Sequence, residues 1–496
     1  MNVSLYTALA EFWGDLCEEI RLFLPVRKIE NGISEEGISI RHEVTSNLHR
    51  SEIFLNGEKK GEFSITGEEK ESDAPLIYKK FRKRAAKNCV FGLLSAYTGQ
   101  TPPWGSLTGV RPSKLMRDNI REKGEDAAEE LFKSEFHVSQ HKIDFLKKIC
   151  AVQKPIIDSI TEESLDIYIG IPICVSKCAY CSFPSILTTK DGGLEEKYVS
   201  SLVRQIEAAA EIAEKRKVRS MYIGGGTPTA LNAKQLARVL KAAKYLHNGC
   251  VYTIEAGRPD TIDEEKLSLI REAGAARISV NAQTTCDATL QRIGRAHSAE
   301  DFFRKFELAK SFGFSSINCD LIVGLPGEDE AVFEKSLSEV MALGADNITV
   351  HTLAIKRASR FAEENEGAFI SAETAEGIIE QAREKLFSQG FIPYYMYRQK
   401  YMAGNLENAG YCLPGSECIY NVDIMEEVAD ILALGGGGIS KRIFRKEEKL
   451  VRAASVKDVY SYIDRTDEMI GRNRELFLGK QKRSGLYEVG FFVVKL

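Results

Sequence analysis

From Asp166 onward, apolar runs rich in β-branched residues alternate with amphipathic stretches of helical period, at a spacing of roughly 30 residues. This alternation is typical of βα units stacked around a parallel sheet. Six strands are expected, and they begin near residues 166, 220, 251, 277, 317 and 347 with the sequences DIYIGIP, SMYIGGG, VYTIEAG, RISVNAQ, INCDLIVGL and NITVHTLA. Six units are too few for a closed eight-stranded barrel, so the pattern favours a partial (β/α)6 barrel.

The first 160 residues have a different pattern. An N-terminal helix is followed by the β-like runs GISIRHEV, SEIFL and GEFSIT, and an Asn56-Gly57 pair between the last two predicts a hairpin turn. Helical periodicity then returns over 76–97, 114–133 and 140–160. We therefore expect an α+β module at 1–160, a core at 161–400 and a loop-rich extension at 401–496, with FIPYYMYRQ as one further strand near the end of the core.

Composition narrows the class of protein. The chain has 496 residues with 44% hydrophobic and 28% charged residues, which excludes disorder as its main character. A net charge of -4 gives no basic field for nucleic acid. The absence of a long apolar run and of a basic, apolar leader predicts a cytoplasmic protein without a membrane span.

Three of the 11 cysteines stand close together, in the loop GIPICVSKCAYCSF that follows the first core strand. Cys174, Cys178 and Cys181 form a CxxxCxxC motif at the strand's carboxyl end, where a βα barrel carries its active site. Soft thiolates select zinc, copper(I) or an iron–sulfur cluster. The loop offers no fourth ligand, so a four-iron cluster with one open iron and a zinc site completed by a distant residue both remain as interpretations.

Other strand ends place polar groups at the same mouth. The second strand ends in GGGTPT, where glycines allow a ligand close to the backbone. Glu255, Gln283, Arg295 and Asp320 follow or lie in the next strands. Carboxylates there can accept hydrogen bonds from ribose hydroxyls, and a guanidinium can pair with a carboxylate.

These motifs together resemble the radical S-adenosylmethionine (SAM) enzymes. The strings YIGIPIC, CAYCSF, GGGTPT, IGRAHS and CDLIVGLPGE are similar to the oxygen-independent coproporphyrinogen III oxidase family over about residues 165–355. PYYMYRQKYMAGNLENAGYC, LALGGGGISK and PWGSLTGVRPSKL resemble its HemZ-type branch of coproporphyrinogen dehydrogenases, so the likeness spans most of the chain.

The resemblance implies cofactors and their ligands. Cys174, Cys178 and Cys181 would hold a 4Fe-4S cluster. The residues that would bind SAM are Tyr168, Tyr180, Gly225, Gly226, Thr227, Glu255, Gln283, Arg295, Asp320 and Ile439. The best-known members carry a fourth Cys where this chain has Phe183 and a His where it has Gly170, and the form CxxxCxYCxF is similar to relatives that act as haem chaperones or as haem-opening methyltransferases.

The activity that the resemblance implies is an oxidoreductase reaction of anaerobic haem biosynthesis. A 5′-deoxyadenosyl radical removes a hydrogen atom from a propionate side chain of coproporphyrinogen III, the carboxyl group leaves as carbon dioxide, and loss of a further electron gives a vinyl group. This happens twice per molecule and yields protoporphyrinogen IX. A tetrapyrrole with four carboxylates needs basic anchors, for which Arg111, Arg357 and Arg398 are candidates. The expected partners are the tetrapyrrole and an electron donor such as a flavodoxin or ferredoxin. A haem chaperone without turnover and a radical methyltransferase that opens haem are the alternative functions.

Overall fold

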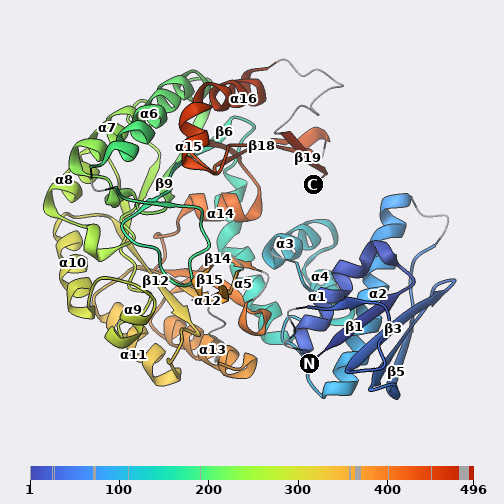
Figure 1. Cartoon of the computed structure of the whole chain (residues 1–496). Helices are drawn as coiled ribbons and strands as arrows, with labels where there is room; N and C mark the ends of the chain where they lie inside the picture. Colours follow the sequence, from blue (N-terminus) through green and yellow to red (C-terminus); the bar gives the residue numbers. More distant parts are fainter. Residues whose placement is uncertain are drawn as a thin grey trace. The chain divides into compact units, whose positions relative to one another are not determined.

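The protein is seen in a computed structural model that describes residues 2–24, 26, 28–70, 74–109, 111–189, 191–247, 249–356, 359–363, 370–399, 402–447, 449–479 and 491–495 (Figure 1). The chain forms two compact units. The first comprises Met1–Lys148 with Gly404–Leu406, and the second comprises Ile149–Ala403 with Glu407–Leu496. The sequence analysis expected three parts instead, with bounds at 1–160, 161–400 and 401–496. These bounds stay a prediction.

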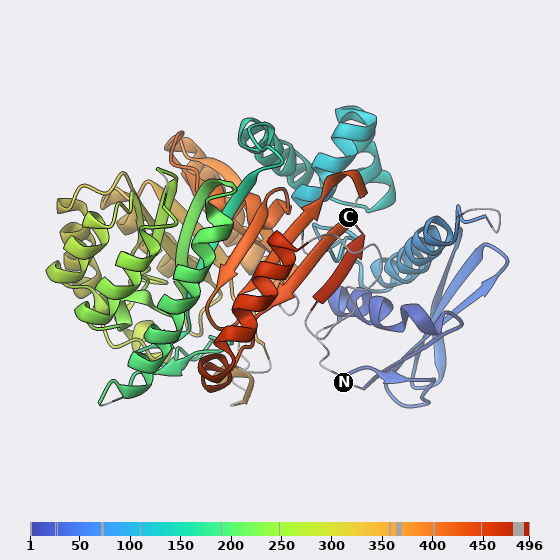
Figure 2. The same ribbon diagram turned by 90° about the horizontal axis from the view of Figure 1, so that it is seen from above.

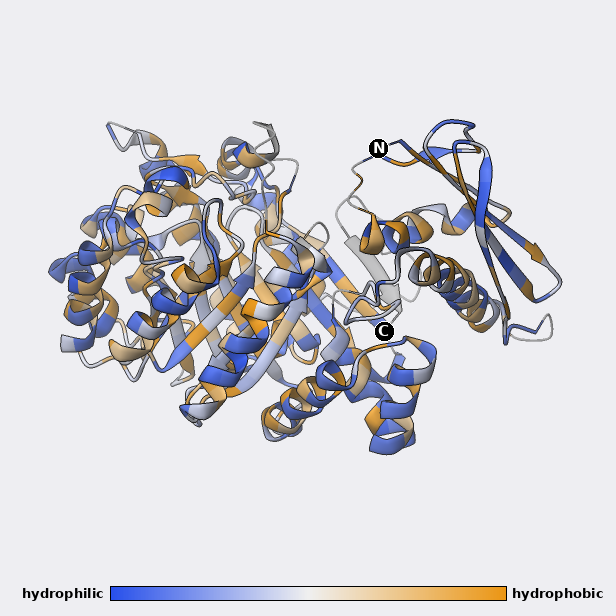
Figure 3. Ribbon diagram, turned by 90° about the horizontal axis from the view of Figure 1, so that it is seen from below, coloured by the Kyte–Doolittle hydropathy of each residue, from blue (hydrophilic) through white to orange (hydrophobic). Residues whose placement is uncertain are grey.

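The first unit is an α+β module built on a five-stranded sheet of order β2-β1-β3-β4-β5. Its strands are β1 (Val3–Thr7), β2 (Glu30–Asn31), β3 (Ile38–Thr45), β4 (Leu48–Leu55) and β5 (Glu58–Thr66), and its main helices are α1 (Trp13–Phe23), α2 (Pro75–Thr98), α3 (Pro112–Lys123), α4 (Glu125–Glu130) and the start of α5 (Gln140–Asp158). Along the strands hydrophilic and hydrophobic residues alternate, as Figure 3 shows. The predicted hairpin turn is confirmed, because Asn56 and Gly57 both have positive φ, at 52° and 79°.

The second unit contains all six predicted core strands, parallel and adjacent in chain order. They are β6 (Ser164–Ile171), β9 (Lys217–Gly225), β10 (Val251–Glu255), β11 (Arg277–Ser279), β12 (Ser316–Val323) and β13 (Asn347–Thr352). The helices between them are α6 (Gly193–Ala213), α7 (Ala233–Ala243), α8 (Glu264–Glu272), α9 (Asp287–Arg292), α10 (Ala299–Ser311) and α11 (Glu330–Ala342), and they lie on the outer side of the strands (Figure 1). Side-chain caps begin several of them, such as Asn232 before α7 and Ser298 before α10. The predicted mixed α/β class with a partial barrel is confirmed.

The segment FIPYYMYRQ forms the expected further strand, Ile392–Arg398, and the chain after it contributes strands where the sequence suggested loops. β14 (Ile392–Arg398), β15 (Glu407–Cys412), β16 (Asp430–Leu434), β17 (Ile439–Phe444), β18 (Lys449–Ala454) and β19 (Phe491–Lys495) belong to the same twelve-stranded sheet (Figure 2), and α13 (Ala372–Ser388), α14 (Ile419–Glu426), α15 (Val459–Asp464) and α16 (Thr466–Leu478) accompany them. The strand β16 pairs in parallel with β6, with Asp430 opposite Leu165. The sequence did not predict this seventh parallel strand, because four glycines directly follow β16 and suggest a loop.

No helix in the described ranges combines the length and the apolar character that crossing a membrane requires.

Candidate functional site

The three clustered cysteines line one cavity of about 180 Å³ in the second unit, at the carboxyl end of β6. Cys174 ends the short strand β7 (Ile173–Cys174), which pairs with β8 (Ile186–Leu187). None of the three forms a disulfide. The loop between them is held by its neighbours, because Ala179 N–H donates to the Ile293 carbonyl at 2.9 Å and Thr227 Oγ1 donates to Cys174 Sγ at 3.7 Å.

The buried thiols need a positively charged partner before they become good metal ligands. Burial raises the pKa of Cys174 and of Cys181, so each is a poor thiolate until a positive partner compensates it. A tetrahedral zinc with bonds of about 2.3 Å would hold its sulfur ligands about 3.8 Å apart. Among the described residues, the three cysteines do not form a group whose ligand atoms all lie within 4.8 Å of one another. The three sulfur atoms are therefore not gathered as closely as ligands around one zinc ion.

The glycine-rich segment after β9 lies directly against the cysteine loop. Gly226 N–H donates to the Ile171 carbonyl at 2.9 Å, and Thr227 N–H donates to the Ile173 carbonyl at 2.8 Å. A Cβ on Gly226 would stand 2.6 Å from the Ile173 carbonyl oxygen, so only glycine fits there. Gly225, with φ of 112°, makes the turn that this approach requires.

Four predicted polar residues line this cavity, and they are Glu255 at the end of β10, Gln283 after β11, Arg295 after α9 and Asp320 within β12. Tyr180 joins them, since its hydroxyl donates to Gln283 Oε1 at 3.1 Å. Arg295 donates from Nη1 to the Asn281 carbonyl at 2.7 Å, while its buried Nε has no hydrogen-bond partner. A buried donor without a partner indicates a place for an acceptor group of a ligand.

The two carboxyl groups of the cavity differ in their charge at neutral pH. Burial raises the pKa of Glu255 to about 7, against the hydrogen bond that its Oε1 accepts from Tyr222 at 2.6 Å. Burial also opposes ionisation of Asp320, yet the pKa of Asp320 is lowered because His351 and Asn318 stabilise its charged form. Glu255 is therefore the group of this cavity that changes charge near neutrality.

Several predicted residues lie elsewhere. Tyr168 does not line the cavity and stacks on Tyr420, with ring centroids 6.0 Å apart, behind the glycine turn. Ile439 is 43% exposed at the start of β17 and also lies outside the cavity lining. Arg398 is buried at the end of β14, Arg111 precedes α3 in the first unit, and Arg357 falls outside the described residues. The roles predicted for these five residues stay predictions.

Sequence reasoning missed other residues that line the cavity, among them Ser176, Gly257, Arg258 and Asn281. Arg258 is the most polar of them, and it is 3% exposed. Its position in the sequence could have identified it, because Arg258 lies in the loop EAGRPD, three residues after Glu255 at the end of β10. Any side chain in that loop lies at the mouth, because the carboxyl ends of parallel strands meet there.

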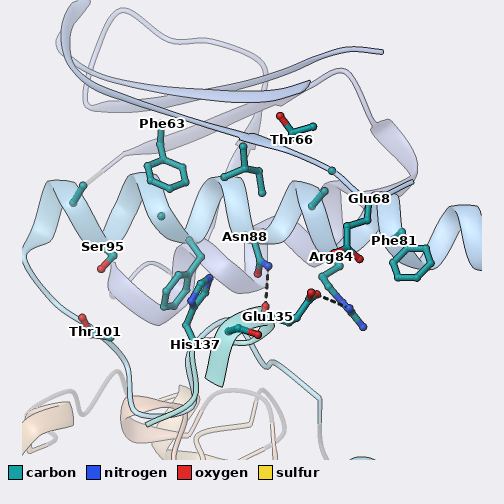
Figure 4. A pocket seen from close by; sticks show the side chains of 17 residues that line it. Phe63, Thr66, Glu68, Phe81, Arg84, Asn88, Ser95, Thr101, Glu135 and His137 are labelled. Atoms are coloured by element: carbon teal, nitrogen blue, oxygen red, sulfur yellow. Dashed lines mark hydrogen bonds and ion pairs between the residues drawn. The ribbon is translucent and has the colours of Figure 1, made fainter. Parts of the chain in front are cut away.

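A larger cavity of about 630 Å³ lies within the first unit, between β5, α2 and the segment after α4. Its lining is mostly apolar, with Phe63 and Phe81 among the side chains in Figure 4. Two of its polar side chains bond to a third residue of the lining: Arg84 pairs with Glu135 at 2.6 Å, and Asn88 donates to the carbonyl of Glu135 at 2.8 Å. The lining includes no cysteine, so the CxxxCxxC motif belongs to the smaller cavity.

Comparison with known proteins identifies relatives over most of the chain. The family model described as the radical SAM superfamily matches residues 168–340. The oxygen-independent coproporphyrinogen-III oxidase-like protein HemZ of Bacillus subtilis is 36% identical over 443 residues, which cover 86% of this chain and 88% of that protein. The heme chaperone HemW of Haemophilus influenzae is 30% identical over 60% of this chain and 76% of its own length.

A solved structure supports the fold. The coproporphyrinogen III oxidase HemN of Escherichia coli, described as a radical SAM enzyme, superposes with a TM-score of 0.52 at 23% identity. The match covers 65% of this chain and 73% of the other.

Proposed function

Because this chain belongs to the radical SAM superfamily and, within it, to the HemZ-like branch of the oxygen-independent coproporphyrinogen III oxidase family, we propose that it converts two propionates of coproporphyrinogen III to vinyl groups. Its cofactors are a 4Fe-4S cluster and SAM. The observation that carries the proposal is the 86% coverage of the chain by the HemZ likeness, which is far more than the residues 168–340 matched by the superfamily model.

The cluster would be held by Cys174, Cys178 and Cys181. They line one cavity, their spacing exceeds that of a single-ion site, and the loop that carries them is fixed by backbone hydrogen bonds. When bound, the cluster and SAM supply a carbon-centred radical that removes hydrogen from the substrate. The protein contributes position and the exclusion of water.

SAM would be bound by the polar groups around the same cavity. The backbone at Gly225, Gly226 and Thr227 is open to a ligand's amino group, and the unpartnered Nε of Arg295 suits its carboxylate. Glu255 and Asp320 would accept hydrogen bonds from the nucleoside. Tyr180 of the cysteine loop would be held in place by its hydrogen bond to Gln283, beside these groups.

The substrate assignment is tested by turnover. The iron-reconstituted protein is incubated without oxygen with SAM, a strong reductant and coproporphyrinogen III, and the products are followed by chromatography with mass detection. We expect loss of two carboxyl groups from the porphyrinogen together with 5′-deoxyadenosine. Deoxyadenosine without any change in the porphyrinogen would reject this substrate while leaving the radical chemistry in place.

Arg398, Arg111 and Arg357 are proposed as anchors for the remaining carboxylates, and a flavodoxin or ferredoxin is proposed as the electron donor.

A haem chaperone is the second candidate, favoured by the 30% identity to HemW over 60% of the chain. The two functions differ in whether the protein binds haem and in whether it converts coproporphyrinogen III. A chaperone would bind haem stoichiometrically and leave coproporphyrinogen III unchanged, whereas the proposed dehydrogenase turns the porphyrinogen over. A haem titration by absorbance beside the turnover assay distinguishes them.

Affinity for SAM will increase as pH rises through about 7. The pKa of Glu255 is raised to about 7 by burial, so this side chain is a neutral acid below that pH and a stronger acceptor for hydroxyl donors above it. We expect the dissociation constant to fall by about tenfold from pH 6 to pH 8, about 1.4 kcal/mol. Glu255→Gln cannot ionise and should flatten the profile, as measured by calorimetry on the reconstituted protein. A profile of unchanged slope in that variant would contradict the assignment.

A further inference from the structure

Arg258 connects the loop after β10 to the cysteine loop after β6. Its Nη1 donates to Ser176 Oγ at 2.7 Å and to the Ser176 carbonyl at 3.3 Å, and it lies 3.8 Å from Cys178 Sγ within hydrogen-bonding geometry. The other side of the guanidinium forms a two-pronged pair with Asp260, with Nε to Oδ1 at 3.0 Å and Nη2 to Oδ2 at 2.8 Å.

This arrangement fixes the guanidinium in a single orientation. The side chain is 4% exposed, and the planar fork matches the Asp260 carboxylate, which leaves only Nη1 to face the cysteine loop. Asp260 is set in place by the short helix η4 (Pro259–Thr261), in which the Arg258 carbonyl accepts from Thr261 Oγ1 at 2.8 Å. Arg258 is therefore a rigid donor aimed at the middle cysteine, rather than a mobile surface charge.

We propose that Arg258 is a positioning residue for the iron–sulfur site, which clamps the cysteine loop at Ser176 and donates a hydrogen bond to the Cys178 sulfur that raises the reduction potential of the cluster. This inference rests on the proposed assignment of the cluster to Cys174, Cys178 and Cys181. Hydrogen bonds to cluster sulfurs and local charge are among the factors that set the potential of such clusters. A donor beside a ligand sulfur stabilises the reduced, more negative state, and Asp260 moderates this effect by pairing with the same guanidinium.

The test is the midpoint potential of the reconstituted cluster, measured by redox titration with electron paramagnetic resonance and without SAM. Arg258→Gln removes the charge and should lower the ratio of reduced to oxidised cluster about tenfold at a fixed potential, a shift of about 59 mV to more negative values. Asp260→Asn leaves the guanidinium uncompensated and should shift the potential in the opposite direction. Arg258→Lys keeps the positive charge but cannot form the two-pronged pair with Asp260. Its midpoint potential should lie between those of Arg258→Gln and the unsubstituted protein.

Arg277→Gln is the matched control. Arg277 is also a buried arginine, 7% exposed, and it donates Nη2 to the Ser416 carbonyl at 2.7 Å at the beginning of β11, outside the lining of the cysteine cavity. Its substitution should leave the potential unchanged.

Shifts of opposite sign in Arg258→Gln and Asp260→Asn support the proposal, because a purely structural role would disturb both variants in the same direction. An unchanged potential in both, or shifts of the same sign, would overturn it. If Arg258→Gln fails to retain a cluster, Asp260→Asn still decides by the sign of its shift. An unsubstituted protein that takes up no cluster would instead reject the proposed function on which this inference rests.

Discussion

A Cys178→Ala variant will fold but lose its iron–sulfur cluster and, with it, the cleavage of SAM. Cys178 lies between the other two cysteines in the lining of the same cavity, and two ligands do not hold a four-iron cluster that needs three. Iron content after anaerobic reconstitution should fall to background, and deoxyadenosine formation should fall by more than about 100-fold, beyond the cost of losing an outer-shell partner. Both are measured on the same preparation.

Cys412→Ala is the control for that experiment. Cys412 is a fully buried free thiol at the end of β15 and does not line the cavity. Its removal should cost about 1 kcal/mol of unfolding free energy and leave iron loading unchanged. A Cys178→Ala protein that still forms deoxyadenosine at the parental rate would show that the cluster is held elsewhere.

Gly226→Ala should have the second largest effect, on SAM binding and on stability together. The added Cβ would meet backbone atoms of the cysteine-loop strand, 2.6 Å from the Ile173 oxygen and 2.7 Å from the Ile173 nitrogen, and backbone cannot rotate away as a side chain does. Overpacking of this kind costs roughly 1–3 kcal/mol. We expect affinity for SAM to fall by at least about tenfold, which is about 1.4 kcal/mol. Calorimetric titration and denaturant unfolding measure the two effects.

Gly377→Ala is the matched glycine substitution. Gly377 lies inside α13, and a Cβ there would meet nothing within 4 Å. The change should stabilise the protein by about 0.5–1 kcal/mol, because alanine loses less backbone entropy in a helix than glycine. Equal SAM affinity in Gly226→Ala and Gly377→Ala would contradict the placement of the glycine-rich segment in the binding site.

The six core strands were predictable because a buried parallel strand leaves a continuous apolar run, and each run is followed by a helix of clear period. The polar residues at the strand ends were predictable for the same reason, since topology alone brings Glu255 and Asp320 to one cavity. The strand β16 was missed because it runs directly into Gly435–Gly438, a composition typical of a loop.

The role of Arg258 could not be predicted from the sequence, because it depends on which loop the side chain contacts. An arginine near a strand end is most often a surface ion pair, and its pairing with Asp260 two residues later is compatible with that reading. Only the three-dimensional contact with Ser176 and Cys178 distinguishes it. Long-range contacts of this kind leave no periodic trace in the chain.

The parallel pairing of β16 with β6 sets an order of events during synthesis. The strand β6 leads straight into the cysteine loop, and seven of its eight residues are buried once β9 and β16 flank it. Until the ribosome has made residues 430–434, β6 has an open apolar edge on one side, which is a template for misassociation. The cysteine loop therefore leaves the ribosome long before the second neighbour of β6 does, and we expect a nascent chain to need protection of this open edge in the interval.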